Sequence, residues 1–314
     1  MTLAEEALAG ERFEKMTEGM PSGGKAILAL SALVMIWGYN WVVMKVALQY
    51  SSPFDYAALR VLLGGISLVL VLIWLRKPLL PKKVSGTFLA GFLQTSGFYG
   101  LSTLALVSGG AGKTAVLNYA MPFWVVLLAW LVLGEQLQKV QLFGVALALA
   151  GLLFILMPFS LAEGLFSKGL ALLSSMSWSI GIIVSKKLQQ KGNLDLLSFT
   201  TWQMLFGSIP LILLALIIPS APITWSVPFI SAMIYSVILG NAVAWLLCFY
   251  ALSRLSAGMA GLGMLGAPVV GVLTAWIQLG EKPTLPETIG MVLIIFALVL
   301  NSAQAMKPPP RCRS

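Results

Sequence analysis

The feature of this sequence that most constrains its fold is a series of long apolar runs separated by short connections. A helix needs about 20 mainly apolar residues to cross the hydrocarbon core of a bilayer. Ten runs are long enough, at 26–49, 56–75, 84–108, 114–133, 140–157, 169–185, 196–218, 227–252, 257–279 and 285–304. Charged residues make up only 10% of the chain, which is too few to cover the surface of a water-soluble fold. The sequence therefore predicts an all-α integral membrane protein with ten transmembrane helices.

The basic residues predict how these helices are oriented. Cytoplasmic connections of membrane proteins are enriched in Lys and Arg. If the amino terminus is cytoplasmic, fifteen of the 20 Lys and Arg residues fall on that side. Because the number of crossings is even, both termini are expected in the cytoplasm. The net charge of +9 is scattered between apolar runs, so we expect a lipid bilayer and a small molecule as partners and no nucleic acid.

The chain contains an internal repeat. Residues 111–155 match residues 257–301 at a constant offset of 146 positions, through Ala111-Gly112 and Ala257-Gly258, Pro122 and Pro268, and Leu133-Gly134-Glu135 and Leu279-Gly280-Glu281. Five crossings per copy invert the second copy, an architecture that many secondary transporters use. We expect a tail at 1–24, a first repeat at 25–158, a second repeat at 159–305 and a basic tail at 306–314. A duplicated membrane scaffold without transport is the alternative.

A mid-helix Pro followed by Leu-Gly-Glu and a Gly-spaced last helix, found twice, resembles the EamA repeat of the drug/metabolite transporter superfamily. The chain is also similar to YddG-type amino-acid exporters in Tyr99, in Asn118-Tyr119 before Pro122, and in Ser177-Trp178. The resemblance implies a multi-pass secondary transporter of the bacterial inner membrane. It would export small metabolites, above all aromatic and other apolar amino acids, by alternating access and without ATP.

Aromatic and amide side chains within the spans are the candidates for substrate binding, because polar groups inside a membrane usually face a cavity or another helix. The candidates are Trp37, Asn40, Trp41, Tyr99, Asn118, Tyr119, Trp178, Asn241 and Trp245. Rings offer stacking surface, and each amide offers a donor and an acceptor. This lining suits a small amphipathic substrate with an apolar side chain. Helix packing and an interfacial aromatic belt remain the alternatives.

Charged residues near the span ends have two interpretations. Lys45 and Lys186 occupy matching positions of the two repeats and either flank the two entrances or snorkel to lipid headgroups. Asp55 and Arg60 are expected to pair with each other near one end of the second span. The glutamates of the Leu-Gly-Glu motifs, Glu135 and Glu281, are expected to cap helices or form pairs in loops.

Pro122 and Pro268 interrupt equivalent helices and are the candidate hinges. Such breaks can act as hinges or can expose backbone polar groups to a substrate. Kinks without such a role are also common in membrane helices. No Asp or Glu lies deep in any predicted span, so the sequence does not indicate how transport is coupled to an ion.

Several other functional classes are disfavoured. The chain has no His and only two Cys, and no Ser–Lys pair lies deep in a span, so we expect neither catalysis nor a metal or cofactor site. The segment 108–114 resembles a P-loop but lacks its first Gly and a preceding strand, so no nucleotide site is expected. A channel would need a selectivity filter, and no candidate filter is evident. Broad-specificity metabolite or drug efflux remains an alternative, although a cationic drug would favour a carboxylate in the cavity.

Overall fold

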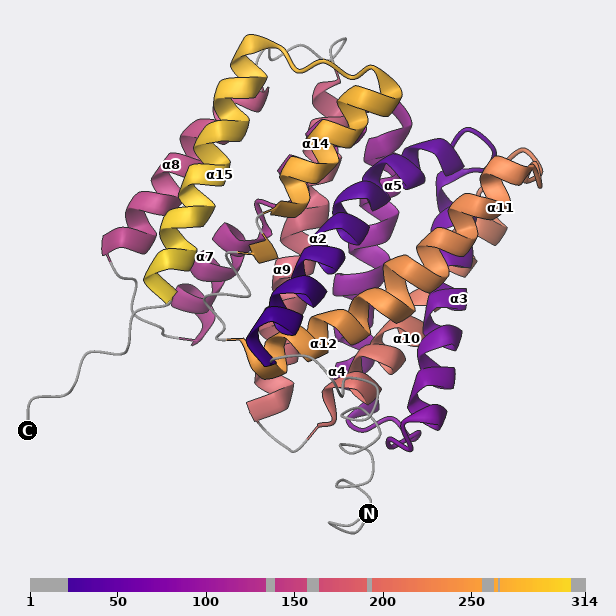
Figure 1. Cartoon of the computed structure of the whole chain (residues 1–314). Coiled ribbons are helices and arrows are strands. Elements are labelled where there is room, and N and C mark those ends of the chain that lie inside the picture. Colours follow the sequence, from indigo (N-terminus) through magenta and orange to yellow (C-terminus); the bar gives the residue numbers. More distant parts are fainter. Residues whose placement is uncertain are drawn as a thin grey trace, which may run out of the picture.

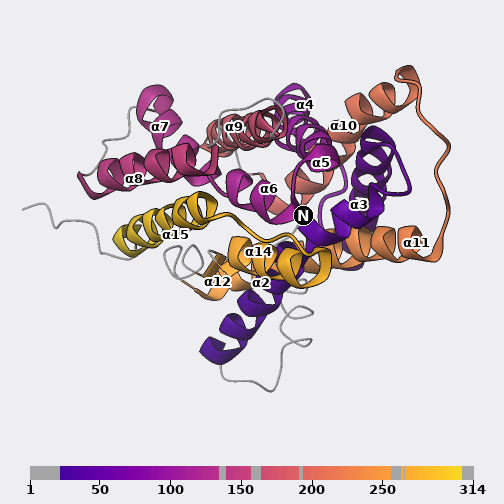
Figure 2. The same ribbon diagram turned by 90° about the horizontal axis from the view of Figure 1, so that it is seen from above.

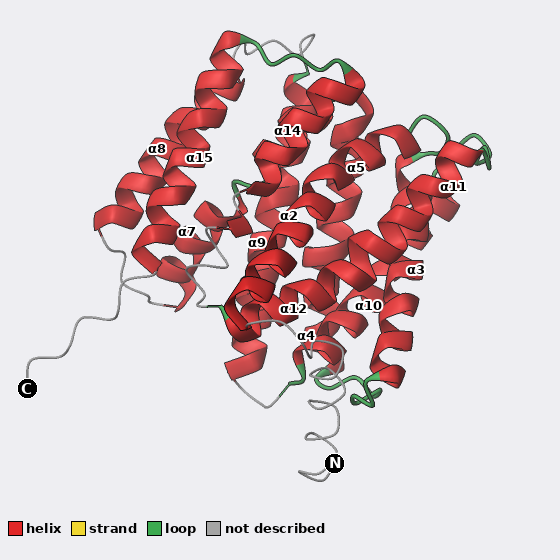
Figure 3. Ribbon diagram, in the orientation of Figure 1, coloured by secondary structure: helices red, strands yellow, loops and turns green. Residues whose placement is uncertain are grey.

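The computed structural model describes residues 22–133, 139–156, 164–190, 194–255, 263–264 and 266–305. Within these residues all regular elements are helices and no strand occurs, which confirms the predicted all-α fold (Figure 1, Figure 3). Six helical segments are long and apolar enough to cross a membrane: Gly24–Ala47, Pro53–Trp74, Ala111–Val132, Leu165–Gln190, Leu196–Ile217 and Val227–Arg254. Shorter apolar helices cover Leu142–Phe154, Gly266–Leu279 and Leu285–Ala297.

The first half of the chain forms five helical rods. They are α2 (Ser22–Ala47), α3 (Pro53–Trp74), the continuous series α4 (Val84–Gly91), η1 (Phe92–Gly97) and α5 (Phe98–Ser108), the pair α6 (Ala111–Asn118) and α7 (Met121–Leu133), and α8 (Lys139–Leu156). The run expected as one helix over 114–133 starts earlier, at Ala111, and breaks at Tyr119 and Ala120. Pro122 lies just after this break, in the first turn of α7, where a helix tolerates a missing N–H.

The second half repeats this order. Its elements are α9 (Leu165–Gln190), α10 (Leu196–Ile217), the series α11 (Val227–Ile234), η3 (Tyr235–Val243) and α12 (Ala244–Arg254), then α14 (Gly266–Leu279) and α15 (Leu285–Ala305). In each half the third rod contains a π-helical segment, η1 or η3, which the pattern of apolar runs does not predict. Four predicted features lie wholly or partly outside the described residues: most of the tail at 1–24, the whole tail at 306–314, the first Leu-Gly-Glu motif beyond Leu133, and residues 257–262 and 265 of the ninth predicted span.

Capping side chains determine where several helices begin. The Ser52 hydroxyl accepts a hydrogen bond from the Asp55 amide at 3.1 Å, and Pro53 follows as the first helical residue. The Asp195 carboxylate accepts from the Ser198 amide at 2.9 Å and starts α10. These caps satisfy amides that have no partner within their own helix. The Ser52 cap explains why α3 begins three residues earlier than its apolar run.

Helices of the two halves pack on each other in matching pairs. The second rods α3 and α10 contact each other, as do the fifth rods α8 and α15, which lie together at one edge of the molecule (Figure 1, Figure 2). The first rod of each half contacts the fourth rod of the other half, α2 with α14 and α9 with α6 and α7. The first rods also contact the third rods across the halves, α9 with α5 and α2 with α12. The helix packing thus repeats the internal symmetry of the sequence.

Large apolar side chains cover much of the outer surface. Ile277, Val227 and Leu216 are 82%, 81% and 78% exposed. A soluble monomer rarely exposes extensive apolar surface. This surface fits the hydrocarbon core of a bilayer.

Candidate functional site

Two groups of aromatic rings lie beside α2. In the first, the Phe98 ring contacts the rings of Trp178 and Tyr99, with centroid distances of 4.7 Å and 5.1 Å, and Trp41 at 6.5 Å. These rings come from α2, α5 and α9, so both halves contribute. The structure brings three of the sequence-predicted residues together here. Phe98 was missed because a single apolar ring in an apolar run gives no distinguishing signal.

The second aromatic group joins α2 to α12. The Trp37 and Trp245 rings meet edge to face at 5.7 Å, and Trp245 stacks on Phe249 at 5.6 Å. The Trp37 indole N–H donates to the Gly240 carbonyl in η3 at 3.1 Å. That bond holds the π-helical segment against α2.

A buried arginine lies beside the first aromatic group. Arg60 on α3 is 1% exposed, and its guanidinium carbon is 4.5 Å from the centroid of the Tyr99 ring and 5.7 Å from that of Tyr56. The Tyr56 hydroxyl is 2.7 Å from the Ser236 hydroxyl of η3. Cation–π contacts of this kind favour a cation on the ring face. Both tyrosines therefore position the guanidinium without neutralising it.

The predicted pair between Asp55 and Arg60 is wrong. The Asp55 carboxylate accepts hydrogen bonds from the hydroxyls of Ser52 at 2.7 Å and Ser220 at 2.8 Å. Residues five apart on an α-helix point to different faces, so the two side chains diverge. Among the described residues no carboxylate forms an ion pair with Arg60, and its Nε and Nη1 atoms have no hydrogen-bond acceptor.

Two buried amides have unpartnered oxygens. Asn241 in η3 donates from Nδ2 to the Ser236 carbonyl at 2.8 Å, whereas its Oδ1 has no donor. Asn40 on α2 donates from Nδ2 to the Met44 sulfur at 3.3 Å, and its Oδ1 also has no donor. Buried polar atoms are normally hydrogen-bonded, so these atoms require an explanation. Both residues are sequence-predicted candidates.

Asn118 instead lies in a completed network. Its Nδ2 donates to the Thr114 carbonyl at 2.9 Å, and its Oδ1 accepts from the hydroxyls of Ser102 and Ser174. The network links α5, α6 and α9, so the Asn118 amide joins three helices, as in the helix-packing alternative. Tyr119 is half-buried at the C-terminal end of α6.

The two candidate entrance lysines have different surroundings. The Lys45 ammonium donates to the carbonyls of Leu106, Val107 and Gly109, at 3.2 Å for Val107 and 2.8 Å for Gly109. It therefore caps the C-terminal end of α5, as basic side chains commonly do. Lys186 is exposed near the opposite end of the bundle, two residues before Leu188, whose carbonyl accepts from Lys83.

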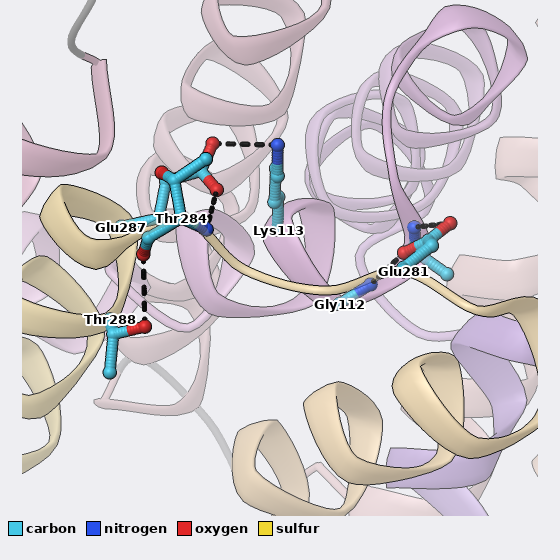
Figure 4. A network of polar contacts seen from close by, with 7 residues as sticks. Gly112, Lys113, Glu281, Thr284, Glu287 and Thr288 are labelled. Carbon is cyan, nitrogen blue, oxygen red and sulfur yellow. Dashed lines mark hydrogen bonds and ion pairs between the residues drawn. The ribbon is translucent and has the colours of Figure 1, made fainter.

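The second Leu-Gly-Glu motif connects the two halves (Figure 4). α14 ends at Leu279, and Gly280 takes a positive φ of 68° that favours glycine. The Glu281 carboxylate then accepts hydrogen bonds from the amides of Ala111 at 2.9 Å and Gly112 at 3.1 Å. It thus caps the N-terminal end of α6, where a negative charge is favoured.

An ion pair strengthens the same connection. The Lys113 ammonium is 2.6 Å from Oε1 of Glu287, a residue that is 3% exposed. Glu287 Oε2 accepts from the Thr284 amide at 2.8 Å, which starts α15 (Figure 4). Two carboxylates therefore hold the first turn of α6, Glu281 from the segment after α14 and Glu287 from the first turn of α15.

The family profile described as "EamA-like transporter family" matches residues 24–157 and again residues 166–303. The chain belongs to this family. The relatives of this EamA chain include the Bacillus subtilis protein named "Uncharacterized transporter YoaV", which is 28% identical over 284 residues, covering 88% of this chain and 97% of that protein. A Salmonella typhimurium protein named "Probable amino-acid metabolite efflux pump" is 29% identical over 281 residues, covering 86% and 92%.

A solved crystal structure supports the fold of this EamA protein. It aligns with a TM-score of 0.65 at 17% identity, over 90% of this chain and 98% of the other. The alignment extends over nearly the whole of both chains, so the two chains share one fold.

The candidate hinges of the EamA chain differ in their surroundings. Pro122 is exposed next to the break between α6 and α7, whereas Pro268 is buried in the first turn of α14. A third proline, Pro210, lies inside α10 without ending it. A small surface pocket is lined by residues such as Pro81, Asp195 and Trp202, and none of its lining residues belongs to the two aromatic groups beside α2.

Proposed function

We propose that this EamA protein is a ten-span secondary transporter of the bacterial inner membrane with both termini in the cytoplasm. It exports amino acids with aromatic or other apolar side chains, by alternating access between two inverted repeats. The observation that supports this most is the position of the Trp41, Phe98, Tyr99 and Trp178 rings, which both repeats contribute, next to buried amides with unpartnered oxygens. Rings accommodate the side chain, and amides accommodate the polar end.

The name of the Salmonella typhimurium relative, "Probable amino-acid metabolite efflux pump", supports amino-acid metabolites as the broad substrate class. Matched packing of α2 with α14 and of α9 with α6 and α7 supports an exchange between two symmetry-related states. Efflux of a broader set of metabolites by the same repeats is the second candidate, because the rings do not by themselves select an amino acid.

The test uses purified protein in liposomes with labelled phenylalanine, tryptophan, methionine and glutamate, with and without a pH gradient. We expect saturable flux of the three apolar substrates and little flux of glutamate. The effect of the gradient on accumulation measures proton coupling. Flux that does not saturate would indicate a channel, and no amino-acid flux from folded protein would favour general metabolite efflux.

We place the hinges at Pro122 and Pro268. Replacing either with Ala restores a backbone donor and favours a continuous helix. We expect the Pro122→Ala variant to show a lower maximal rate at nearly unchanged substrate affinity, measured by counterflow and by equilibrium binding in detergent. Pro210→Ala, in a helix outside the fourth rods, is the matched control. Equal rates for both variants and the wild type would contradict the hinge assignment.

A further inference from the structure

The Arg60 guanidinium is buried without a negatively charged partner among the described residues. A guanidinium stays protonated in proteins, and a buried charge is costly unless it is paired. Arg60 is 1% exposed and has no ion pair among the described residues, and its Nε and Nη1 atoms have no acceptor. These two nitrogens belong to different edges of the guanidinium plane, so each edge contains a donor without an acceptor.

Acceptors without donors lie near this cation. The two other side chains with unpartnered buried atoms in the described residues are Asn40 and Asn241, through Oδ1 in each case. A Cβ built on Gly240 would lie 3.3 Å from Asn40 Oδ1 and 3.9 Å from Arg60 Nη2, so both atoms lie beside the same backbone position. A Cβ on Gly64, one turn after Arg60, would lie 2.5 Å from Asn241 Nδ2.

We propose that Arg60 binds the α-carboxylate of the transported amino acid and that the amide oxygens of Asn40 and Asn241 accept hydrogen bonds from its α-ammonium group. This proposal rests on the proposed amino-acid transport. A buried cation next to two buried carbonyl-type oxygens matches a zwitterion, which presents an anion and N–H donors a short distance apart. A phosphate or sulfate matches less well, because its oxygens would face the amide oxygens without a donor between them.

The surroundings of Arg60 also place the substrate side chain. The Tyr99 ring contacts the guanidinium at 4.5 Å and the Phe98 ring at 5.1 Å. A carboxylate on Arg60 therefore brings the rest of the molecule next to the aromatic group with Trp41 and Trp178. In this arrangement the aromatic group selects apolar side chains, and Arg60 with the two amides recognises the charged groups of the amino acid. Both lie in adjoining parts of one site.

The experiment compares three ligands that differ only at the polar end: phenylalanine, phenylalaninamide without the carboxylate, and 3-phenylpropionate without the ammonium. Each competes with labelled phenylalanine in counterflow and is tested for thermal stabilisation of the purified protein. The variants are Arg60→Gln, Arg60→Lys and Asn40→Leu. The matched control is Arg76→Gln, which removes an exposed arginine just after the same helix.

We expect wild type and Arg76→Gln to bind phenylalanine at least ~10-fold more tightly than its amide, as for a hydrogen-bonded charged group. In Arg60→Gln the ratio of the affinities for phenylalanine and its amide falls towards one, because only phenylalanine binds less tightly. Arg60→Lys keeps a positive charge and retains part of this ratio. Asn40→Leu loses the preference for phenylalanine over 3-phenylpropionate. An unchanged ratio in folded Arg60→Gln overturns the proposal. If the Arg60 variants do not fold, equal binding of phenylalanine and its amide by wild type overturns it.

Failure of the proposed function gives a different result. If wild type transports no amino acid but 3-phenylpropionate stabilises it and not Arg60→Gln, then Arg60 binds a carboxylate and only the amino-acid assignment is wrong. If none of the three ligands stabilises folded wild type, and none is transported, both proposals are overturned.

Discussion

At the scale of single residues, we propose that the aromatic group around Phe98 contacts the side chain of the substrate. The Phe98 ring contacts Trp178 of α9 and its own neighbour Tyr99 on α5. The Tyr99 ring also contacts the Arg60 guanidinium. An aromatic contact contributes about 0.5–1.5 kcal/mol beyond its buried area, which corresponds to a ~2- to 10-fold change in affinity.

We expect Trp178→Ala and Tyr99→Ala to lower the apparent affinity for apolar amino acids within that range, and Tyr99→Phe to have a smaller effect because it keeps the ring. The measurement is the concentration dependence of flux in liposomes. Trp130→Ala on the exposed side of α7 is the control. Wild-type affinity in both Ala variants would show that these rings only pack the helices.

Asn118 leads to a prediction about stability. Its amide links Ser102 and Ser174 across three helices. Interhelical hydrogen bonds in membranes contribute about 0.6 kcal/mol on average and at most about 1.7 kcal/mol.

Asn118→Ala is therefore expected to destabilise the protein by about 1 kcal/mol, since it removes two such bonds. Thermal unfolding in detergent measures this loss. A double-mutant cycle with Ser174→Ala isolates the coupling between the two side chains. Additive losses would mean that the network does not stabilise the bundle.

Other residue-scale features were not predictable from the sequence. The residues around Arg60 depend on which helices pack against α3. The spacing of residues within α3 does not predict those helices. Asn40 and Asn241 were predicted as candidates because amides are rare in apolar runs, but their unpartnered oxygens emerge only from the packed structure. Local chemistry predicted candidate residue types, whereas the assembled helices determined their partners.

At the scale of elements, the crossing of α4 and α10 depends on two glycines. A Cβ on Gly91 would lie 2.4 Å from the Gln203 carbonyl oxygen and 3.0 Å from the Gly207 amide nitrogen. Both are backbone atoms, so the helices would have to separate. Small residues allow such close helix contacts in membranes.

Gly91→Ala is expected to cost about 1–3 kcal/mol, the usual range for overpacking, and to lower the unfolding midpoint. Gly169→Ala on α9 is the matched control, because a Cβ there meets no atom within 4 Å. If both variants unfold at the wild-type temperature, the α4–α10 crossing is looser than the structure indicates.

Helix positions were predicted more accurately than helix ends and helix form. Apolar runs placed the rods because the bilayer requires about 20 apolar residues per crossing. They did not predict the early start of α3, which the Ser52 cap produces, or the break before α7 at Tyr119. The π-helical segments η1 (FLQTSG) and η3 (YSVILGNAV) lie within longer apolar runs and share no residue pattern that distinguishes them from α-helix.

At the scale of the whole molecule, Glu281 of the second half is hydrogen-bonded to the first half at the start of α6. Its carboxylate lies on the first two amides of α6, and these hydrogen bonds to a charged acceptor must break if the halves separate at this end. Glu281→Gln keeps the size of the side chain but removes the charge. We therefore expect it to shift the conformational equilibrium towards the state that is open at this end.

The measurement is the rate of thiol labelling at Ala111→Cys, a position that is fully buried in this structure, in a background without Cys248 and Cys312. Faster labelling in Glu281→Gln than in the exposed-site control Lys282→Gln is expected. The repeat pairs Glu281 with Glu135, so Glu135→Gln is expected to shift the equilibrium in the opposite direction. Equal labelling rates in all three variants would show that these carboxylates do not hold a closed state.

The cap on α6 also bears on how such a chain can be divided. The negative group that completes the start of this helix is supplied from the other repeat, and α2 and α9 likewise find packing partners there. A single repeat made alone would leave these amides and apolar faces without partners, unless a second copy of the repeat supplied them. Gene duplication and fusion would convert such a pair of identical subunits into one chain.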